Sequence, residues 1–104
     1  MKNEKVVLSV KFKSTYDAKE LTGLCHKHLQ LFKDVPGLLE KYYLSEDNTG
    51  AISGIYIFES KDAREAFWNS ELAKDIPGTY GVIPETLRVE QFGVTIDMNE
   101  SVLA

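Results

Sequence analysis

The sequence has little cysteine, few basic residues and no long apolar run. Its single cysteine among 104 residues can form no disulfide within the chain and can supply no cysteine-rich zinc site. The 12 Lys and Arg are outnumbered by 16 Asp and Glu, which argues against binding to nucleic acid because phosphate contacts need clustered cations. A membrane-spanning helix needs about 18 consecutive apolar residues, and the sequence contains no such stretch, so we expect no contact with membranes.

Signals for export are also missing. Residues 1–5 are mostly polar and lead directly into an alternating pattern, whereas a signal peptide carries a continuous apolar run. We therefore expect a cytoplasmic, reducing location. The length fits one domain that spans residues 1–104, and the 43% of hydrophobic residues is typical of a globular fold.

The first part of the chain predicts a strand and a helix. Residues 6–12 alternate between apolar and other side chains, which indicates a strand with one strongly apolar face. Asp17 and Glu20 then have the spacing of a capping box, so the helix begins near Asp17, or at Thr15 if the box does not form. Apolar residues recur every three or four positions through this helix, which Pro36 ends.

The rest of the chain predicts three more strands and a second helix. Residues 39–45 and 51–59 flank a polar turn and indicate a hairpin. Ser60 is a suitable cap for the helix that follows. Residues 76–85 hold two prolines and two glycines and predict a loop, and residues 86–96 predict the last strand.

The resulting order, β-α-β-β-α-β, is that of the ferredoxin-like α+β fold, a four-stranded antiparallel sheet with two helices on one face. Two helices cover only one face of such a sheet. The other face carries apolar side chains from several strands and needs a cover of its own, for which a second copy of the chain is the simplest candidate. We therefore predict a homodimer in which two sheets face each other as a barrel.

A set of turn, strand and helix segments carries a resemblance to a known family. The set comprises Val35-Pro36-Gly37-Leu38, the aromatic strand with Lys41 after it, the strand at 54–59, the helix with Ala63 and Ala66, and Gly81-Val82 before a strand with Phe92. Together these segments resemble the YdhR-type mono-oxygenases of the dimeric α/β-barrel superfamily. That superfamily also contains the antibiotic-biosynthesis mono-oxygenases.

The resemblance implies a ferredoxin-like protomer, a barrel-forming homodimer and a pocket between the sheet and the two helices. Relatives with established chemistry oxidise electron-rich polycyclic phenols with molecular oxygen, often without a metal or flavin, so we expect no cofactor. Other members degrade haem, isomerise lactones or only bind ligands. The haem-degrading members have an Asn on the first strand and a His after their Trp, and this sequence has neither.

His28 and Tyr56 are the candidate catalytic residues. His28 lies near the centre of the apolar stripe of the first helix, and histidine is a residue type that moves protons in enzymes, so it is the first candidate for a base that removes a phenolic proton. Tyr56 is the second candidate, and the alternative is that both residues belong to the core. His26 is two positions from His28 and points elsewhere on a helix, so the pair cannot chelate a metal, and we expect no metal site.

Four further residues are candidates for substrate binding: the aromatic Tyr42, Trp68 and Tyr80, and the cation Arg88. Aromatic rings bind flat ligands through stacking and contact area. Tyr42 and Tyr43 are adjacent on a strand and point to opposite faces, so at most one of them lines a pocket. The alternatives are core or interface positions for the rings, an inert loop around Tyr80, and a salt bridge across the dimer for Arg88.

Three functions remain open at this point. The first is a cofactor-independent mono-oxygenase that acts on a small aromatic substrate, phenolic or quinol-like, between sheet and helices. The second is a non-enzymatic, ligand-binding or stress-related dimer that holds a small apolar molecule in the same pocket. The third is an isomerase or decarboxylase that acts on a small ring acid, with Arg88 on the carboxylate.

Overall fold

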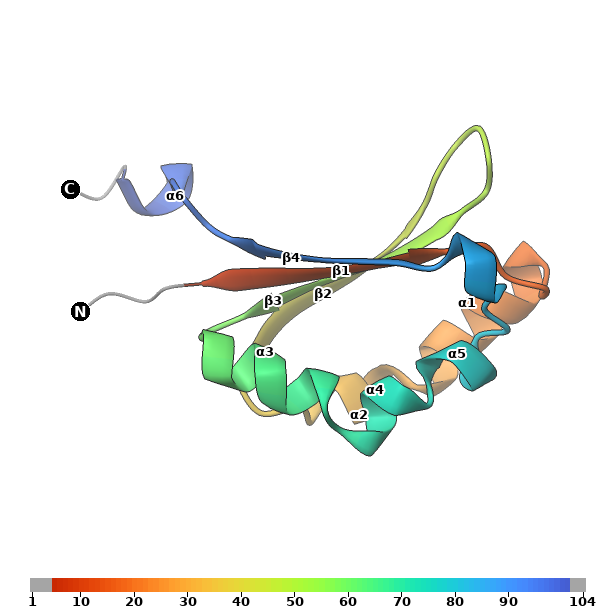
Figure 1. The fold of residues 1–104 in the computed structure, drawn as a ribbon, viewed down its shortest axis with the longest axis horizontal. Helices are drawn as coiled ribbons and strands as arrows, with labels where there is room; N and C mark the ends of the chain where they lie inside the picture. Colours follow the sequence, from red (N-terminus) through yellow and green to blue (C-terminus); the bar gives the residue numbers. More distant parts are fainter. Residues whose placement is uncertain (1–4, 102–104) are drawn as a thin grey trace.

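The computed structural model describes residues 5–101 and contains one four-stranded sheet with a layer of short helices on one face (Figure 1). In chain order the elements are β1 (Val6–Phe12), α1 (Ala18–Lys27), α2 (Leu29–Lys33), β2 (Leu38–Ser45), β3 (Ile52–Phe58), α3 (Lys61–Trp68), α4 (Glu71–Lys74), α5 (Ile76–Thr79), the 3₁₀ turn η1 (Pro84–Thr86), β4 (Arg88–Gly93) and α6 (Met98–Ser101). The helices α1 to α5 lie below the sheet in Figure 1, whereas α6 lies beyond one end of the sheet. None of the helices in this described part of the chain is long and apolar enough to span a bilayer.

The sheet has the strand order β2-β3-β1-β4, and every neighbouring pair of strands is antiparallel. This order, with the helices together on one face, confirms the predicted ferredoxin-like α+β fold. β1 and β3 are the central strands, and their register pairs Leu8 with Tyr56 and Val10 with Gly54. β2 and β4 form the two edges of the sheet.

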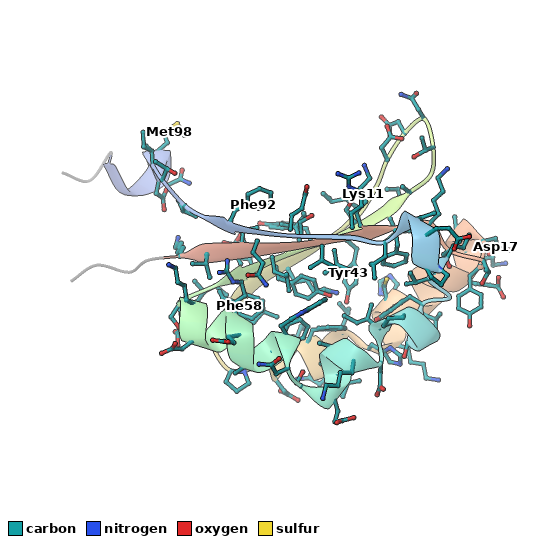
Figure 2. All side chains as sticks on the ribbon, in the orientation of Figure 1. Lys11, Asp17, Tyr43, Phe58, Phe92 and Met98 are labelled. Atoms are coloured by element: carbon teal, nitrogen blue, oxygen red, sulfur yellow. The ribbon has the colours of Figure 1, made fainter. Side chains whose placement is uncertain are left out.

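The apolar alternation predicted for the first strand is confirmed. The core-facing side chains Val6, Leu8, Val10 and Phe12 are all buried beneath the helices. Buried partners from the opposite layer include Leu21, Phe32, Phe67 and Ile76. Full burial of one such large apolar side chain contributes about 1.5–3 kcal/mol, so this layer is the main source of stability. Figure 2 shows Phe58, a further core residue, on the helical side of the sheet.

The first helix begins as predicted but is divided into two. Asp17 and Glu20 form the capping box: the Asp17 carboxylate accepts the Glu20 N–H at 2.8 Å, and the Glu20 carboxylate accepts the Asp17 N–H at 3.1 Å. The prediction of one uninterrupted helix is wrong at His28. There the backbone has φ −101°, and its N–H is shared between the carbonyls of Leu24 and His26, which tightens the last turn of α1.

The segment after the second helix is more ordered than the sequence predicts. Residues 76–85, predicted as a loop, contain α5 and η1. Pro77 lies in the first turn of α5, where a missing N–H costs no hydrogen bond, and the buried side chains of Ile76 and Tyr80 fix this turn to the core. β4 is shorter than predicted because its partner β1 begins at Val6, which pairs with Gly93.

The face of the sheet opposite the helices is uncovered in the single chain. We call it the open face, and its apolar members are Val7, Tyr42, Leu44, Ile55, Ile57 and Phe92. The Tyr42 and Phe92 side chains are both 49% exposed. Figure 2 shows Phe92 pointing away from the helical layer. A patch of this kind on a small protein marks a contact surface.

Candidate functional site

A small cavity lies between the helical face of the sheet and helices α1 and α5. Its walls are almost entirely apolar, and five of the residues that line it carry a polar group: Cys25, Lys41, Tyr43, Tyr56 and Tyr80. The free volume is about 20 Å³, which is room for about one water molecule. We call this space the inner cavity.

Lys41 of β2 is the residue around which the aromatic side chains of the inner cavity gather. Its Nζ lies 3.5 Å from the centre of the Tyr43 ring, 3.8 Å from that of Phe32 and 4.7 Å from that of Tyr56. Within residues 5–101, the one ion pair links Lys5 to Asp97, so no carboxylate lies within ion-pair distance of Lys41. An amine surrounded by ring faces and lacking an anionic partner is unusual in a protein interior.

A β-bulge at the start of β2 places Lys41 on this side of the sheet. Leu38 pairs with Phe58, but the next paired residue is Glu40, which pairs with Ile57, so one extra residue is inserted at Leu39. A regular ladder in which Leu39 paired with Ile57 would put Lys41 opposite Ile55, on the open face. With the bulge, Lys41 pairs with Tyr56 and faces the helices.

Burial changes the chemistry of this amine. Removal from water lowers the pKa of Lys41 from its ordinary value to about 7, and the nearby Cys25 opposes the shift in part. The ring faces also favour the ammonium form, by about 0.5–2 kcal/mol for a well-placed ring, so they oppose burial as well. Burial has the larger effect, and a substantial share of Lys41 is therefore a neutral amine near pH 7.

The three tyrosines of the inner cavity keep their protons. Burial raises the pKa of Tyr80 to about 12, and it raises the pKa of Tyr43 and of Tyr56 further. The Tyr43 hydroxyl is buried and has no hydrogen-bond partner in the described part of the chain. Tyr43 is therefore a donor that is free to bind an oxygen atom of a ligand.

Gly54 leaves space for the Tyr56 ring. A Cβ added at position 54 would lie 3.2 Å from Cε1 of Tyr56 and 3.4 Å from its hydroxyl oxygen, which shows that this ring lies across the glycine. The Tyr56 side chain therefore stays close to the sheet, inside the core, where it packs on Phe67 with ring centres 5.1 Å apart. A larger residue at position 54 would push the ring into the inner cavity.

His28 does not line the inner cavity but contacts a residue that does. Its Nδ1 lies 3.4 Å from the hydroxyl oxygen of Tyr80, and the two rings meet edge to face with centres 6.0 Å apart. His28 lies at the break between α1 and α2, and Tyr80 is the C-cap residue of α5. His28 can thus exchange a proton with the cavity only through the Tyr80 hydroxyl.

The remaining predicted site residues lie apart from the inner cavity. Tyr42 is on the open face, where its hydroxyl donates to a Glu40 carboxylate oxygen at 2.7 Å, so the expectation that Tyr42 lines the pocket is corrected in favour of its neighbour Tyr43. Arg88 is also on the open face, paired in register with Lys11. Trp68 lies at the end of α3, next to a separate polar groove.

Two residues that the sequence reasoning did not assign to the site are Lys41 and Cys25. Cys25 lies on α1, and burial raises the pKa of its thiol, in keeping with an unreactive group. Lys41 was noted only as part of a strand. The signal that could have found it is its position two residues from Tyr43, since alternate residues of a strand share a face.

Two wider clefts beside β2 share wall residues with the inner cavity. One, with a free volume of about 300 Å³, lies between α2 and β2 and has Phe32, Lys41 and Tyr43 in its wall. We call it the outer cleft. The other, of about 250 Å³, lies along α1 and has Cys25 and Tyr43 in its wall. Lys41 and Tyr43 therefore contact both the inner cavity and the outer cleft.

The described residues contain no ready-made metal site. Nowhere in 5–101 do three or more His, Cys, Asp or Glu side chains come close enough to hold an ion. The polar atoms that meet at the inner cavity are an amine, a thiol and phenolic hydroxyls, which bind and donate protons to small organic ligands.

The fold is shared with solved structures of small proteins that include oxygenases. A monooxygenase from the gene ActVA-Orf6 of Streptomyces coelicolor, in complex with the ligand nanaomycin D, is similar with a TM-score of 0.69 and 16% identity over 91% of each chain. SnoaB, a cofactor-independent oxygenase from Streptomyces nogalater, has a TM-score of 0.65 and 14% identity, with 91% of this chain and 95% of that chain covered. Rv0793 from Mycobacterium tuberculosis has a TM-score of 0.72 and 12% identity, with 90% and 98% covered.

At these identities the likeness establishes the fold alone. No protein-family model matches the sequence. None of the curated proteins matches it either. The structural neighbours include a monooxygenase and a cofactor-independent oxygenase, whereas the narrower resemblance to the YdhR type stays a prediction.

Proposed function

We propose that this protein is a cofactor-independent mono-oxygenase of a small phenolic substrate, which binds beside Lys41. The observation that carries the proposal is a partly buried amine with a pKa of about 7 among three tyrosines and a phenylalanine. The shared fold supports it, since two of the similar structures are described as a monooxygenase and a cofactor-independent oxygenase. A base with a pKa near the working pH is the group that such chemistry needs from the protein.

Lys41 would act as the general base. Its neutral amine takes the phenolic proton and becomes an ammonium, which stays beside the phenolate. In an apolar cavity these opposite charges attract each other more strongly than in water, and the rings of Phe32 and Tyr43 hold the ammonium. The electron-rich phenolate is then the species that reacts with molecular oxygen.

The oxidation itself balances without a bound cofactor. The ring carbon of the activated substrate gives one electron to oxygen, and the two radicals combine to form a carbon–oxygen bond. Cleavage of the resulting peroxide leaves a carbonyl group on the substrate and releases the second oxygen atom as water. The substrate thus loses two hydrogens and gains one oxygen atom, and the protein contributes the proton transfer, the orientation of the ring and the exclusion of water.

The tyrosines would orient the substrate oxygen. Tyr43, Tyr56 and Tyr80 keep their protons because burial raises the pKa of each, so they donate hydrogen bonds to a phenolate and do not remove its proton. This chemistry favours Lys41 over the earlier candidates His28 and Tyr56 as the base. His28 would retain a positioning role through its contact with Tyr80.

Substrate binding requires the cavity to open. A free volume of about 20 Å³ does not hold an aromatic ring, whereas the outer cleft of about 300 Å³ does. Since Lys41 and Tyr43 contact both spaces, a substrate seated in the outer cleft reaches the amine after small shifts of α2 and the two side chains. We infer that the ring lies in the outer cleft with its oxygen toward Lys41.

The test is oxygen uptake with a panel of hydroxylated anthrones, naphthols and quinols. We expect turnover by the wild type on at least one of them and a loss of roughly 10²-fold or more in Lys41→Met, the size usual for removal of a general base. Lys27→Met, at an exposed position of α1, is the matched control and should keep wild-type activity. Equal activity of the Lys41 and Lys27 variants would contradict the assignment of the base.

A second candidate function is a binder that holds a small apolar molecule without turnover. The small size and mostly apolar walls of the inner cavity favour it, because a ligand would displace little water from such a space. A ligand-induced rise in melting temperature without oxygen uptake on any compound of the panel would select the binder over the mono-oxygenase.

We further propose that the working unit is a homodimer formed through the open face. Six apolar side chains on one uncovered sheet face, with Tyr42 and Phe92 half exposed, support this arrangement. A second copy would cover them with an identical surface, as a two-fold interface requires.

A further inference from the structure

We propose that Lys41 is also a carbonyl-capturing nucleophile, which takes a small aldehyde from the outer cleft and holds it as an imine on Nζ. The observation behind this is a lysine that combines three features: a partly buried position among aromatic rings, no carboxylate partner, and a wall position shared by the inner cavity and the outer cleft. This reaction goes beyond the proposed oxygenation, because it needs no oxygen and gives a covalent product on the protein.

The geometry gives the aldehyde a path to the amine. Lys41 and Tyr43 contribute to the walls of both spaces, so the Nζ lies at the boundary between them. Phe32 lines the outer cleft and contacts the amine from the α2 side, with 3.8 Å between Nζ and its ring centre. A shift of this one ring would uncover Nζ toward the cleft.

The state of the amine suits the reaction. Only a neutral amine has the lone pair that attacks a carbonyl carbon, and burial lowers the pKa of Lys41 to about 7. At neutral pH the neutral share is then roughly 10³ times larger than that of an ordinary lysine, whose pKa is about 10.4. The groups that face Nζ are the thiol of Cys25 and the aromatic rings, and none of them would hold it as a tight ion pair.

The bonding changes balance without any oxidant or reductant. The amine lone pair forms a carbon–nitrogen bond as the carbonyl π pair moves to oxygen, and a proton passes from nitrogen to that oxygen. The hydroxyl then accepts a second proton and leaves as water, while the remaining N–H proton is released and the C=N bond forms. Tyr43 is placed to donate a hydrogen bond to the departing oxygen, since its buried hydroxyl has no other partner in the described chain.

The walls favour the imine over its hydrolysis. Imine formation releases water, and the inner cavity has room for about one water molecule among mostly apolar side chains. The rings that surround Nζ in the free protein would also pack on an aromatic aldehyde. We therefore expect aromatic aldehydes to react better than aliphatic ones of similar size.

The experiment is reductive trapping with benzaldehyde and sodium cyanoborohydride near neutral pH. The reductant converts each imine into a stable benzylamine, and peptide mapping by mass spectrometry gives the rate at every lysine. We expect Lys41 to be modified at least about tenfold faster than any other lysine, since its neutral share outweighs its lower exposure. The rate at Lys41 should rise through pH 7 and level off, whereas exposed lysines continue to gain reactivity at higher pH.

Two variants and a parallel assay make the result decisive. Tyr43→Phe keeps the amine and should slow trapping at Lys41, and Lys27→Arg should leave it unchanged. Modification spread evenly over the exposed lysines, with Lys41 the slowest, would overturn the imine site even if oxygen uptake on phenols is intact. Selective trapping at Lys41 without oxygen uptake would support the imine site and contradict the proposed oxygenase.

Discussion

At the level of single residues, the site depends on Lys41, a charged residue that lies among aromatic rings, and the sequence does not show that environment. Lysine is nearly always exposed, so a strand that contains Lys41 reads as one with a solvated position. The aromatic environment of Lys41 becomes visible only when β2 is placed in register, with Lys41 opposite Tyr56 and in contact with Phe32. Candidates that stand out by type, such as His28 and Trp68, were easier to find in the sequence than a common residue in an uncommon environment.

Lys41 should make the stability of the fold depend on pH. Between about pH 7 and pH 10 the unfolded chain still holds the Lys41 proton while the folded chain has lost it, so the free energy of unfolding should rise with pH across this window. The gain should be on the order of a few kcal/mol. Above about pH 10 stability should fall again, because burial raises the pKa of Tyr43, Tyr56 and Tyr80 and only the unfolded tyrosines ionise readily.

Urea unfolding at several pH values would measure this dependence. The rise should disappear in Lys41→Met, which keeps the stem of the side chain and removes the titrating group. A Lys41→Met protein with the same rise as the wild type would show that another group is responsible.

At the level of elements, most strands and both helix starts were predictable because their causes are local. The alternation of apolar residues predicted β1, the polar turn predicted the β2–β3 hairpin, and the capping box of Asp17 and Glu20 predicted the start of α1. The break at His28 and the turn of α5 were not predictable. At the break, one backbone N–H is shared between two carbonyls, and the turn depends on the burial of Ile76; both arise from packing between elements. The faces of β2 depend on a bulge, which no local pattern announces.

Gly37, between α2 and β2, is the glycine that we expect to tolerate substitution least. Its φ is +77°, and an added Cβ would lie 2.5 Å from the Cβ of Ala63 on α3. Gly50 in the hairpin turn has a similar φ of +73° but open space around it. Gly50→Ala should therefore cost about 1–2 kcal/mol for the backbone alone, and Gly37→Ala should cost clearly more because α3 must also move.

Thermal or urea unfolding of the two variants separates the backbone cost from the steric cost. The difference between them reports the close approach of β2 and α3. Equal losses of stability in Gly37→Ala and Gly50→Ala would mean that α3 can move without any loss of folding free energy.

At the level of the whole molecule, the chain has one covered sheet face and one open face. The sequence predicted this imbalance correctly, since the order of elements already fixes which face the helices occupy. It could not say which of two adjacent tyrosines belongs to which face. The structure places Tyr43 inside and Tyr42 outside, next to Ile55 on the open face.

A charge on the open face should break the proposed dimer. Phe92 is 49% exposed on β4, and Phe92→Glu should shift the mass in light scattering toward the monomer, because a carboxylate would be buried without a partner. Leu31→Glu is the matched control: Leu31 is 51% exposed on α2, away from the open face, and its replacement should leave the mass unchanged. A wild-type chain that is already monomeric at micromolar concentration would contradict the dimer.

The bulge at Leu39 sets the faces of β2 by keeping one residue out of the pairing with β3. Deletion of Leu39 would remove the bulge and leave Lys41 paired with Tyr56 and Tyr43 paired with Gly54, so both side chains would still face the helices. Pairing of Leu39 with Ile57 would instead shift every later residue of β2 by one, so that Lys41 faces outward and Tyr42 faces inward. The inner cavity would then lose its amine although no residue had changed, so the chemistry of this strand depends on its register as well as on its residue types.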